Sequence, residues 1–184
     1  MTQIITLRLA DSLPASRRSE WEHLLRIEEH RERRRKLEEY LDRGLGECWL
    51  HRPAIAALAE NALRFFDGQR YGLGAWVIMP NHLHALVDVW DAPLSELMKS
   101  WKSFIAREAN KIIGRRGEFW EREYLDMLIE DETHRQTAVR YIENNPAKAG
   151  LIREAKTWLW SSARFRDEFG RLKHPHRSAD MLSA

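Results

Sequence analysis

Two apolar segments joined by Pro80 and Asn81 constrain the fold more than any other part of this sequence. Residues 70–79 and 82–89 are both rich in β-branched, aromatic and aliphatic side chains, and only two residues separate them. A short Pro-Asn link between two such segments predicts an antiparallel β-hairpin. Further strands are predicted for residues 4–9, where apolar and polar residues alternate, and for residues 119–129.

Three helices are predicted between and after these strands. The first begins at Pro53, whose missing N–H does no harm at the start of a helix, and ends at residues 67–68. The second begins near Pro93 and ends around residues 114–117, with its apolar residues on one side. The third covers residues 131–144 and should stop at Pro146, because the residue before a proline resists helical geometry.

Once a charged segment after the first strand is set aside, the elements form a βαββαβ pattern followed by the third helix. This order predicts an α+β fold, a ferredoxin-like antiparallel sheet with helices on one face. At 184 residues the chain is most simply one domain, which we place at residues 1–165. The polar residues 166–184 are expected to form a flexible C-terminal tail.

The charged segment, residues 16–50, is interpreted as a helical insertion. Residues 17–43 carry nine basic and eight acidic side chains, so the segment is not a polybasic tail. Its apolar residues gather at the two ends, which predicts a helix or helical hairpin with a solvated middle. A contact with a DNA backbone is the alternative, and the sequence alone assigns the insertion no role.

The composition excludes several classes of protein. Cys48 is the only cysteine, so an internal disulfide and a cysteine-rich zinc site are excluded. The formal net charge of +2 gives no strong indication of nucleic-acid binding. No apolar run approaches the ~20 residues of a membrane helix, and the N-terminus lacks the order of a secretory signal. We therefore expect a cytoplasmic protein without a membrane partner, either a monomer or a homodimer.

Four polar residues could form a reactive site. His82 and His84 are two apart on a predicted strand, so their imidazoles share a face and could bind a metal, although HxH also arises by chance. Tyr141 and Asn145 are four apart and share a face near a helix end. The amide could join the imidazoles as a ligand, and the phenol could act as a nucleophile. A packed tyrosine and a helix-terminating asparagine are the alternatives.

Four motifs in order now suggest a family. The segments MPNHLHALV, FWEREY, RYIENNPAKAGLI and WLWSSA resemble the REP-associated tyrosine transposases. These form a branch of the single-tyrosine transposases of the His-hydrophobe-His (HUH) superfamily. The similarity covers roughly residues 74–165 and, more loosely, the first strand.

The resemblance implies a specific chemistry. It implies that His82 and His84 bind a divalent metal ion, Mg²⁺ or Mn²⁺, with Asn145 as third ligand. It implies that Tyr141 attacks a single-stranded DNA phosphate, forming a 5′-phosphotyrosine and releasing a 3′-hydroxyl. Substrates in the family are hairpins from palindromic repeats. Tyr124 is a second tyrosine in the motif region, but it lacks a helical asparagine partner.

Positions of DNA contact are less constrained by the sequence. We expect phosphate contacts or base stacking from six residues that lie on the long second helix, at its end or near the motifs. They are Lys102, Arg115, Arg116, Trp120, Arg122 and Lys148. A solvated helix face explains the lysines and arginines of the second helix equally well.

Two other functions stay open at this stage. A domesticated DNA-hairpin-binding protein would keep the fold and cleave little or nothing, although the intact set of four site residues argues against such decay. A small-molecule metal hydrolase would need a third His or carboxylate ligand. Asp88 has the right strand parity for that role, but it lies four residues beyond His84.

Overall fold

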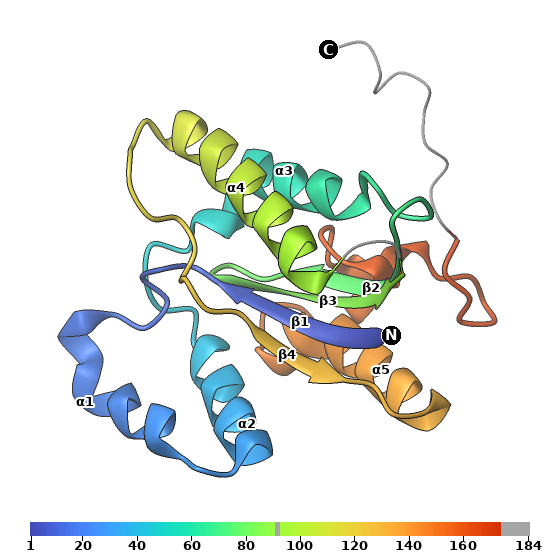
Figure 1. Ribbon diagram of the computed structural model, residues 1–184, viewed down its shortest axis with the longest axis horizontal. Helices are drawn as coiled ribbons and strands as arrows, with labels where there is room; N and C mark the ends of the chain where they lie inside the picture. The colour runs from blue at the N-terminus through green and yellow to red at the C-terminus, as the bar shows by residue number, and fades with distance from the viewer. Residues whose placement is uncertain (91–92, 174–184) are drawn as a thin grey trace.

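Four antiparallel strands form the single sheet of the computed structural model, which describes residues 1–90 and 93–173 (Figure 1). The strands are β1 (Thr2–Arg8), β2 (Tyr71–Ile78), β3 (His82–Val89) and β4 (Leu125–Leu128). They lie in the order β2-β3-β1-β4, with β1 and β3 in the centre. This is the strand order of the ferredoxin-like fold, so the predicted fold class and the predicted hairpin are confirmed.

The two crossover helices cover one face of the sheet (Figure 1). Helix α3 (Pro53–Arg64) begins at a proline, as predicted, and helix α4 (Leu94–Ile113) ends at Gly114, whose φ of 75° requires a left-handed conformation. Their apolar sides pack onto alternate residues of the strands to form the largest core, in which Trp76 is fully buried. This part of the fold follows directly from the helical and strand periodicities.

The opposite face of the sheet is also covered, which corrects the expectation of helices on one face only. Helix α5 (Glu132–Lys148) places Ala138 and Ile142 against Ile4 and Leu86. The prediction that Pro146 ends this helix is also wrong, since the proline lies inside its last turn. There a proline removes a single backbone hydrogen bond, a smaller loss than in the middle of a helix.

The predicted strand over residues 119–129 is shorter than expected, because only Leu125–Leu128 pair along β1. The preceding residues cross the end of β1 through one isolated bridge between Leu9 and Trp120. The ammonium group of Lys102 donates to the carbonyl oxygens of Glu121 and Arg122 at 2.7 and 2.6 Å. These carbonyls thus point at α4 and do not continue a strand ladder.

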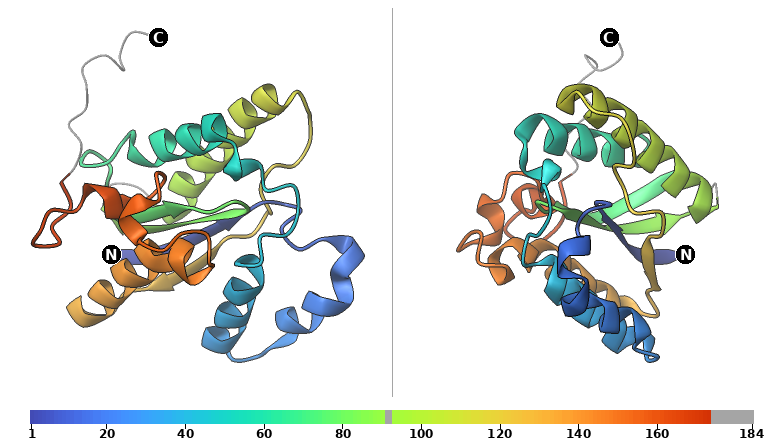
Figure 2. Two further views of the ribbon diagram at one scale, coloured as in Figure 1. Left: turned by 180° about the vertical axis from the view of Figure 1, so that it is seen from behind. Right: turned by 90° about the vertical axis from the view of Figure 1, so that its left-hand side faces the viewer.

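The charged insertion forms a helical hairpin, as predicted from the apolar residues at its two ends. It contains α1 (Arg18–Trp21), α2 (His30–Leu41) and 3-10 turns at Ala15–Arg17, Glu22–Arg26 and Trp49–His51. Its apolar ends form a separate small core from Leu13, Leu24, Leu37, Tyr40 and Leu41. Most of its central residues, 28–35, are exposed. Figure 2 shows that α2 lies beside α5, on the same side of the sheet.

The segment after α5 contains two 3-10 turns, of which Ala155–Thr157 packs against α5 and Ser162–Phe165 packs against β2. Arg166 pairs with Glu143 of α5 at 2.7 Å and donates to the carbonyl of Gly74 at 2.9 Å. Residues 166–173 are therefore anchored, which corrects the prediction of a tail starting at residue 166. Residues 174–184 lie outside the described part. Within the described part, no helix is long and apolar enough to cross a membrane.

Candidate active site

The two histidines of the sequence motif lie at the start of β3 and face helix α5. Because they are two apart on a strand, His82 and His84 project to the same side, and their ring centroids are 4.8 Å apart. Both side chains are completely buried. The pair is therefore part of the interior and not a pair of polar surface residues.

Hydrogen bonds from neighbouring residues orient both rings. The amide of Asn81 donates through Nδ2 to the carbonyl of Leu45 at 3.0 Å, which leaves its Oδ1 to accept from Nδ1 of His82 at 2.8 Å. His82 therefore carries its proton on Nδ1 and a lone pair on Nε2. Nδ1 of His84 lies 2.9 Å from the hydroxyl of Thr6. Among the described residues, neither Nε2 atom has a hydrogen-bond partner.

Burial keeps both imidazoles neutral. It lowers the pKa of His84 to about 3, with smaller contributions from the positive charges of Arg34 and Lys148. Burial likewise lowers the pKa of His82 well below its usual value, and the neighbouring imidazole of His84 lowers it further. Neutral imidazoles offer lone pairs to a metal ion near neutral pH without first losing a proton.

Helix α5 brings the tyrosine and asparagine of the sequence motif to the same place. The Tyr141 ring lies 5.6 Å from the His84 ring, centroid to centroid, within one chain. Asn145 follows one turn later on the same face of the helix and is fully buried. Within the described residues, both amide atoms of Asn145 are buried without hydrogen-bond partners, and the buried Tyr141 hydroxyl has only the Glu38 carboxylate near it. Such groups are costly unless they have a function or a ligand.

The Tyr141 phenol is held in its protonated form. Burial raises its pKa well above the usual value, and the negative charge of Glu38 raises it further. At neutral pH a phenol in this environment is a weak nucleophile, so it needs a positive charge near the group it attacks.

Three residues of the charged insertion also belong to the site, and sequence reasoning missed them. Arg34, Glu38 and Asp42 recur every four residues along and just beyond α2. An oxygen of Asp42 lies 3.9 Å from Nε2 of His82, and its other oxygen lies 3.3 Å from the Lys148 ammonium. Burial raises the pKa of Asp42, whereas Lys148 opposes this change. Their spacing of four residues predicts that they share one face of a helix, but the sequence does not show that this face contacts the site.

The donor atoms fit a divalent metal ion. The Nε2 atoms of His82 and His84 and the Oδ1 of Asn145 are buried, neutral and unpartnered among the described residues, the state expected of ligand atoms. No group of three or more His, Cys, Asp or Glu residues gathers around one point in residues 1–90 and 93–173. A metal here would thus depend on the amide as third protein ligand, as the resemblance implies.

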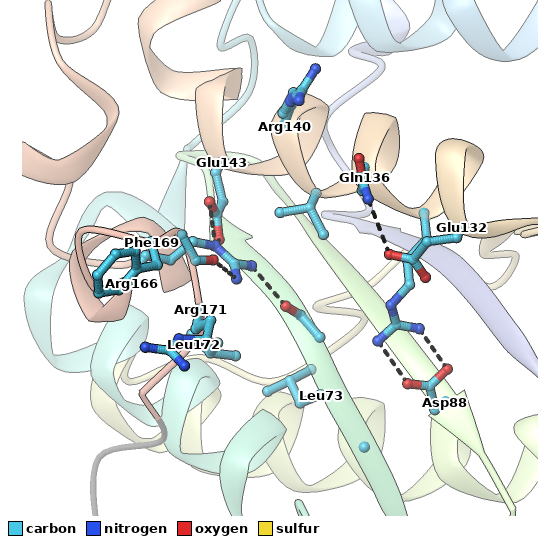
Figure 3. A pocket seen from close by; sticks show the side chains of 15 residues that line it. Leu73, Asp88, Glu132, Gln136, Arg140, Glu143, Arg166, Phe169, Arg171 and Leu172 are labelled. Carbon is cyan, nitrogen blue, oxygen red and sulfur yellow. Dashed lines mark hydrogen bonds and ion pairs between the residues drawn. The ribbon is translucent and has the colours of Figure 1, made fainter.

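Two large cavities lie on opposite sides of α5. The first, about 560 Å³, lies between α2 and α5 and is lined by Arg31, Arg34, Glu38 and Tyr141. The second, about 720 Å³, lies between α5, β2 and residues 166–172 (Figure 3). Its arginines are mostly engaged, as Figure 3 shows for the Arg135–Asp88 pair. Only the first cavity reaches Tyr141.

The residues predicted to contact DNA are scattered. Lys148 lies at the site, with its ammonium 5.6 Å from the centre of the Tyr141 ring. Lys102, Arg115, Arg116 and Arg122 lie on α4 or between α4 and β4, and Arg115 and Arg122 engage Glu118. Trp120 is buried in the core under α3 and α4, so its ring is not available to stack on a base.

The two alternative site residues lie elsewhere. Tyr124 packs against the core on the α3 and α4 side, whereas Tyr141 packs against the core on the α5 side. The carboxylate of Asp88 accepts two hydrogen bonds from Arg135 at 2.9 Å and one from Thr2. Asp88 is therefore satisfied as a structural residue.

A ferredoxin-like sheet with a histidine pair facing a tyrosine on a helix is the arrangement that the resemblance to DNA-processing transposases implies. Comparison with known families agrees: residues 52–145, just over half of the chain, match the model of the family described as "Transposase IS200 like". The chain therefore belongs to the IS200-like transposase family, and its role is transposase-like DNA processing. The matched region begins after the charged insertion, so α1 and α2 lie outside it.

Two solved structures are similar to this chain, and the first supports the fold. A REP-associated tyrosine transposase bound to a REP hairpin is 15% identical, with a TM-score of 0.51 over 89% of this chain and 76% of the other. A candidate transposase from Deinococcus radiodurans is 14% identical, with a TM-score of 0.37 over 79% and 90% of the two chains. No protein with a curated description matches the sequence.

Proposed function

We propose that the protein is a metal-dependent endonuclease and strand transferase that cleaves single-stranded DNA at hairpin-associated sites through a covalent bond to Tyr141. One observation carries this proposal. The Nε2 atoms of two histidines and the amide of Asn145 are all buried and unpartnered within the described part of one chain, beside the buried hydroxyl of Tyr141. A folded protein tolerates such a concentration of unsatisfied polar atoms chiefly where they serve chemistry.

The roles of the residues follow from their chemistry. His82, His84 and Asn145 would hold a divalent ion such as Mg²⁺ or Mn²⁺, which when bound polarises a phosphodiester oxygen. Asn81 fixes the tautomer of His82 by accepting a hydrogen bond from its Nδ1–H group. The hydroxyl of Thr6 makes a hydrogen bond with Nδ1 of His84. Because all three ligands are neutral, the site keeps a positive charge for an anionic substrate.

The reaction is a transesterification. The Tyr141 oxygen bonds to phosphorus, the bond from phosphorus to the 3′ oxygen breaks, and the phenol proton ends on the released 3′-hydroxyl. The DNA is left as a 5′-phosphotyrosine, whose ester energy allows a later 3′-hydroxyl to reverse the reaction without a nucleotide cofactor. Lys148, beside the Tyr141 ring, would favour an approaching phosphate.

Hairpin DNA from palindromic repeats is the proposed substrate. The fold is similar to that of a REP-associated transposase whose structure contains a REP hairpin, and the sequence motifs agree with that branch of the family. At 15% identity this similarity supports the substrate class and not a particular DNA sequence.

The test is the formation of a covalent adduct. The protein is incubated with Mn²⁺ or Mg²⁺ and a labelled hairpin with single-stranded flanks, and a denaturing gel then reveals label bound to protein. The wild type and Tyr124→Phe should form the adduct, whereas Tyr141→Phe and samples with EDTA should not. An adduct that persists in Tyr141→Phe and vanishes in Tyr124→Phe would overturn the assignment.

A domesticated hairpin-binding protein is the second candidate. The complete burial of both histidines favours it, because bound DNA could contact the surface without reaching them. Hairpin binding that is independent of metal, with no adduct under any metal, would identify this function.

A further inference from the structure

We propose that Arg34, in the charged insertion, binds the phosphate group that Tyr141 attacks. Arg34 would thus be a catalytic residue that the family's matched region, which begins at residue 52, does not include. The inference rests on the proposed function, since it places the reacting phosphate beside Tyr141. Three structural observations support it: the position of Arg34, the free donors of its guanidinium group, and the contrast with the neighbouring arginines.

Arg34 and Tyr141 line the same cavity from opposite sides. Helix α2 contributes Arg31, Arg34 and Glu38 to the lining, and helix α5 contributes Tyr141 from its middle. The volume of about 560 Å³ lies within the usual range of ligand pockets, roughly 300–1,000 Å³. The positive charge of Arg34 is close enough to lower the pKa of both Tyr141 and His84, although burial dominates both values.

The guanidinium group of Arg34 has two free donors. Its Nε donates to Glu38 at 2.8 Å, which fixes the plane of the group. Its Nη1 and Nη2 atoms are buried and have no hydrogen-bond partner among the described residues, and the side chain is only 12% exposed. A buried charge with unused donors is expensive unless an anion completes it. Two parallel N–H groups match two oxygens of a phosphate.

The neighbouring arginines of α2 do not share this arrangement. Arg35 also borders the cavity, but it pairs with Glu39 at 2.6 Å and its side chain is 56% exposed. Arg31 is 79% exposed, and its ion pair with Glu130 is long, at 4.0 Å. Arg35 is therefore a matched control, with the same charge, on the same helix and at the same cavity, but exposed to solvent.

The proposed role of Arg34 is electrostatic. As the Tyr141 oxygen bonds to phosphorus and the 3′ oxygen departs, negative charge builds on the two non-bridging oxygens. Donors already in place stabilise this charge without having to reorganise. Arg34 only donates hydrogen bonds in this role, so the phenol proton still ends on the 3′-hydroxyl.

The first experiment measures the rate of adduct formation in a single turnover with Mn²⁺ and a labelled hairpin. Arg34→Gln should slow this rate by about 100-fold, the usual effect of removing one such donor group. Arg35→Gln should stay close to the wild type, and Arg34→Lys should recover only part of the rate, since an ammonium cannot make the bidentate contact. Mn²⁺ affinity, measured by calorimetry, should be unchanged in Arg34→Gln; a parallel loss of metal binding would contradict a role toward the phosphate.

A double variant separates phosphate binding from a simpler effect. Without Arg34, the charge of Glu38 beside Tyr141 is uncompensated and could itself slow the attack. If Arg34 served only to neutralise Glu38, Arg34→Gln combined with Glu38→Gln would regain the wild-type rate, and the proposal would be wrong. If Arg34 binds the phosphate, the double variant stays slow.

A binding experiment keeps this proposal distinct from the proposed nuclease function. In the Tyr141→Phe background, the affinity for a fluorescent 20-nucleotide oligothymidylate is measured by anisotropy. Arg34→Gln should weaken binding about tenfold, the equivalent of one charged hydrogen bond, whereas Arg35→Gln should have little effect. This result would support the phosphate site even if the wild type formed no adduct. Equal effects of the two substitutions on both rate and affinity would refute it.

Discussion

Lowering the pH from 7 to 5 should destabilise the metal-free protein, because its buried histidines resist protonation. The pKa of a histidine is near 6.5 in an unfolded chain, whereas burial lowers the pKa of His84 to about 3 in the folded protein. Between these values the unfolded chain binds a proton that the folded protein does not, so acid favours unfolding. The contribution of His84 is present in full above pH 6.5 and is lost progressively toward pH 3.

For His84 alone, the loss between pH 7 and pH 5 amounts to about 2 kcal/mol of unfolding free energy. His82 acts in the same direction, because its pKa is also lowered by burial. The assay is urea denaturation with EDTA at pH 7, 6 and 5. His84→Gln should lose much of the pH dependence, whereas His51→Gln, at an exposed position, serves as the control for the loss of an imidazole. Identical pH profiles for the wild type and His84→Gln would refute the reasoning.

Three further predictions concern groups around the sheet. Asn81→Ala should lower Mn²⁺ affinity by about 10-fold or more, because His82 loses the partner that fixes its tautomer; calorimetry measures this, and unchanged affinity would contradict the role of Asn81. Arg166→Met should lower the unfolding free energy by about 3 kcal/mol, since it leaves the buried carboxylate of Glu143 without its charged partner and with only the Ser162 hydroxyl donating to it. Gly114→Ala should cost about 1 kcal/mol, because φ is 75° there; urea titrations measure both losses, and unchanged midpoints would count against them.

Much of the fold could be predicted because its signals are local. The hairpin around Pro80 and Asn81, the start of α3 at Pro53 and the end of α4 at Gly114 depend on residues adjacent in the chain. The errors arose where distant groups decide the outcome. Lys102 holds two carbonyls that a longer β4 would have needed, and α5 occupies a sheet face that the βαββαβ pattern leaves open.

The sequence motifs predicted the histidines, the tyrosine and the asparagine of the candidate site. They did not predict the residues that α2 contributes. The structure brings His82, His84 and Tyr141 together and places Asn145 on the same helix face as Tyr141. The contribution of Arg34 and its neighbours on α2 could not be predicted, because it depends on how an insertion folds back over the sheet. Periodicity identifies a helix face, but it does not identify what that face contacts.

The contact between the Tyr141 and His84 rings within one chain has a consequence for stoichiometry. Under the proposed chemistry, every molecule is a self-sufficient catalyst, so the yield of adduct per molecule should not depend on dilution. Mixing Tyr141→Phe with His84→Gln should not restore adduct formation, since neither polypeptide can supply to the other's site the side chain that is missing there. Rescue in such a mixture would mean that helices are exchanged between copies during the reaction.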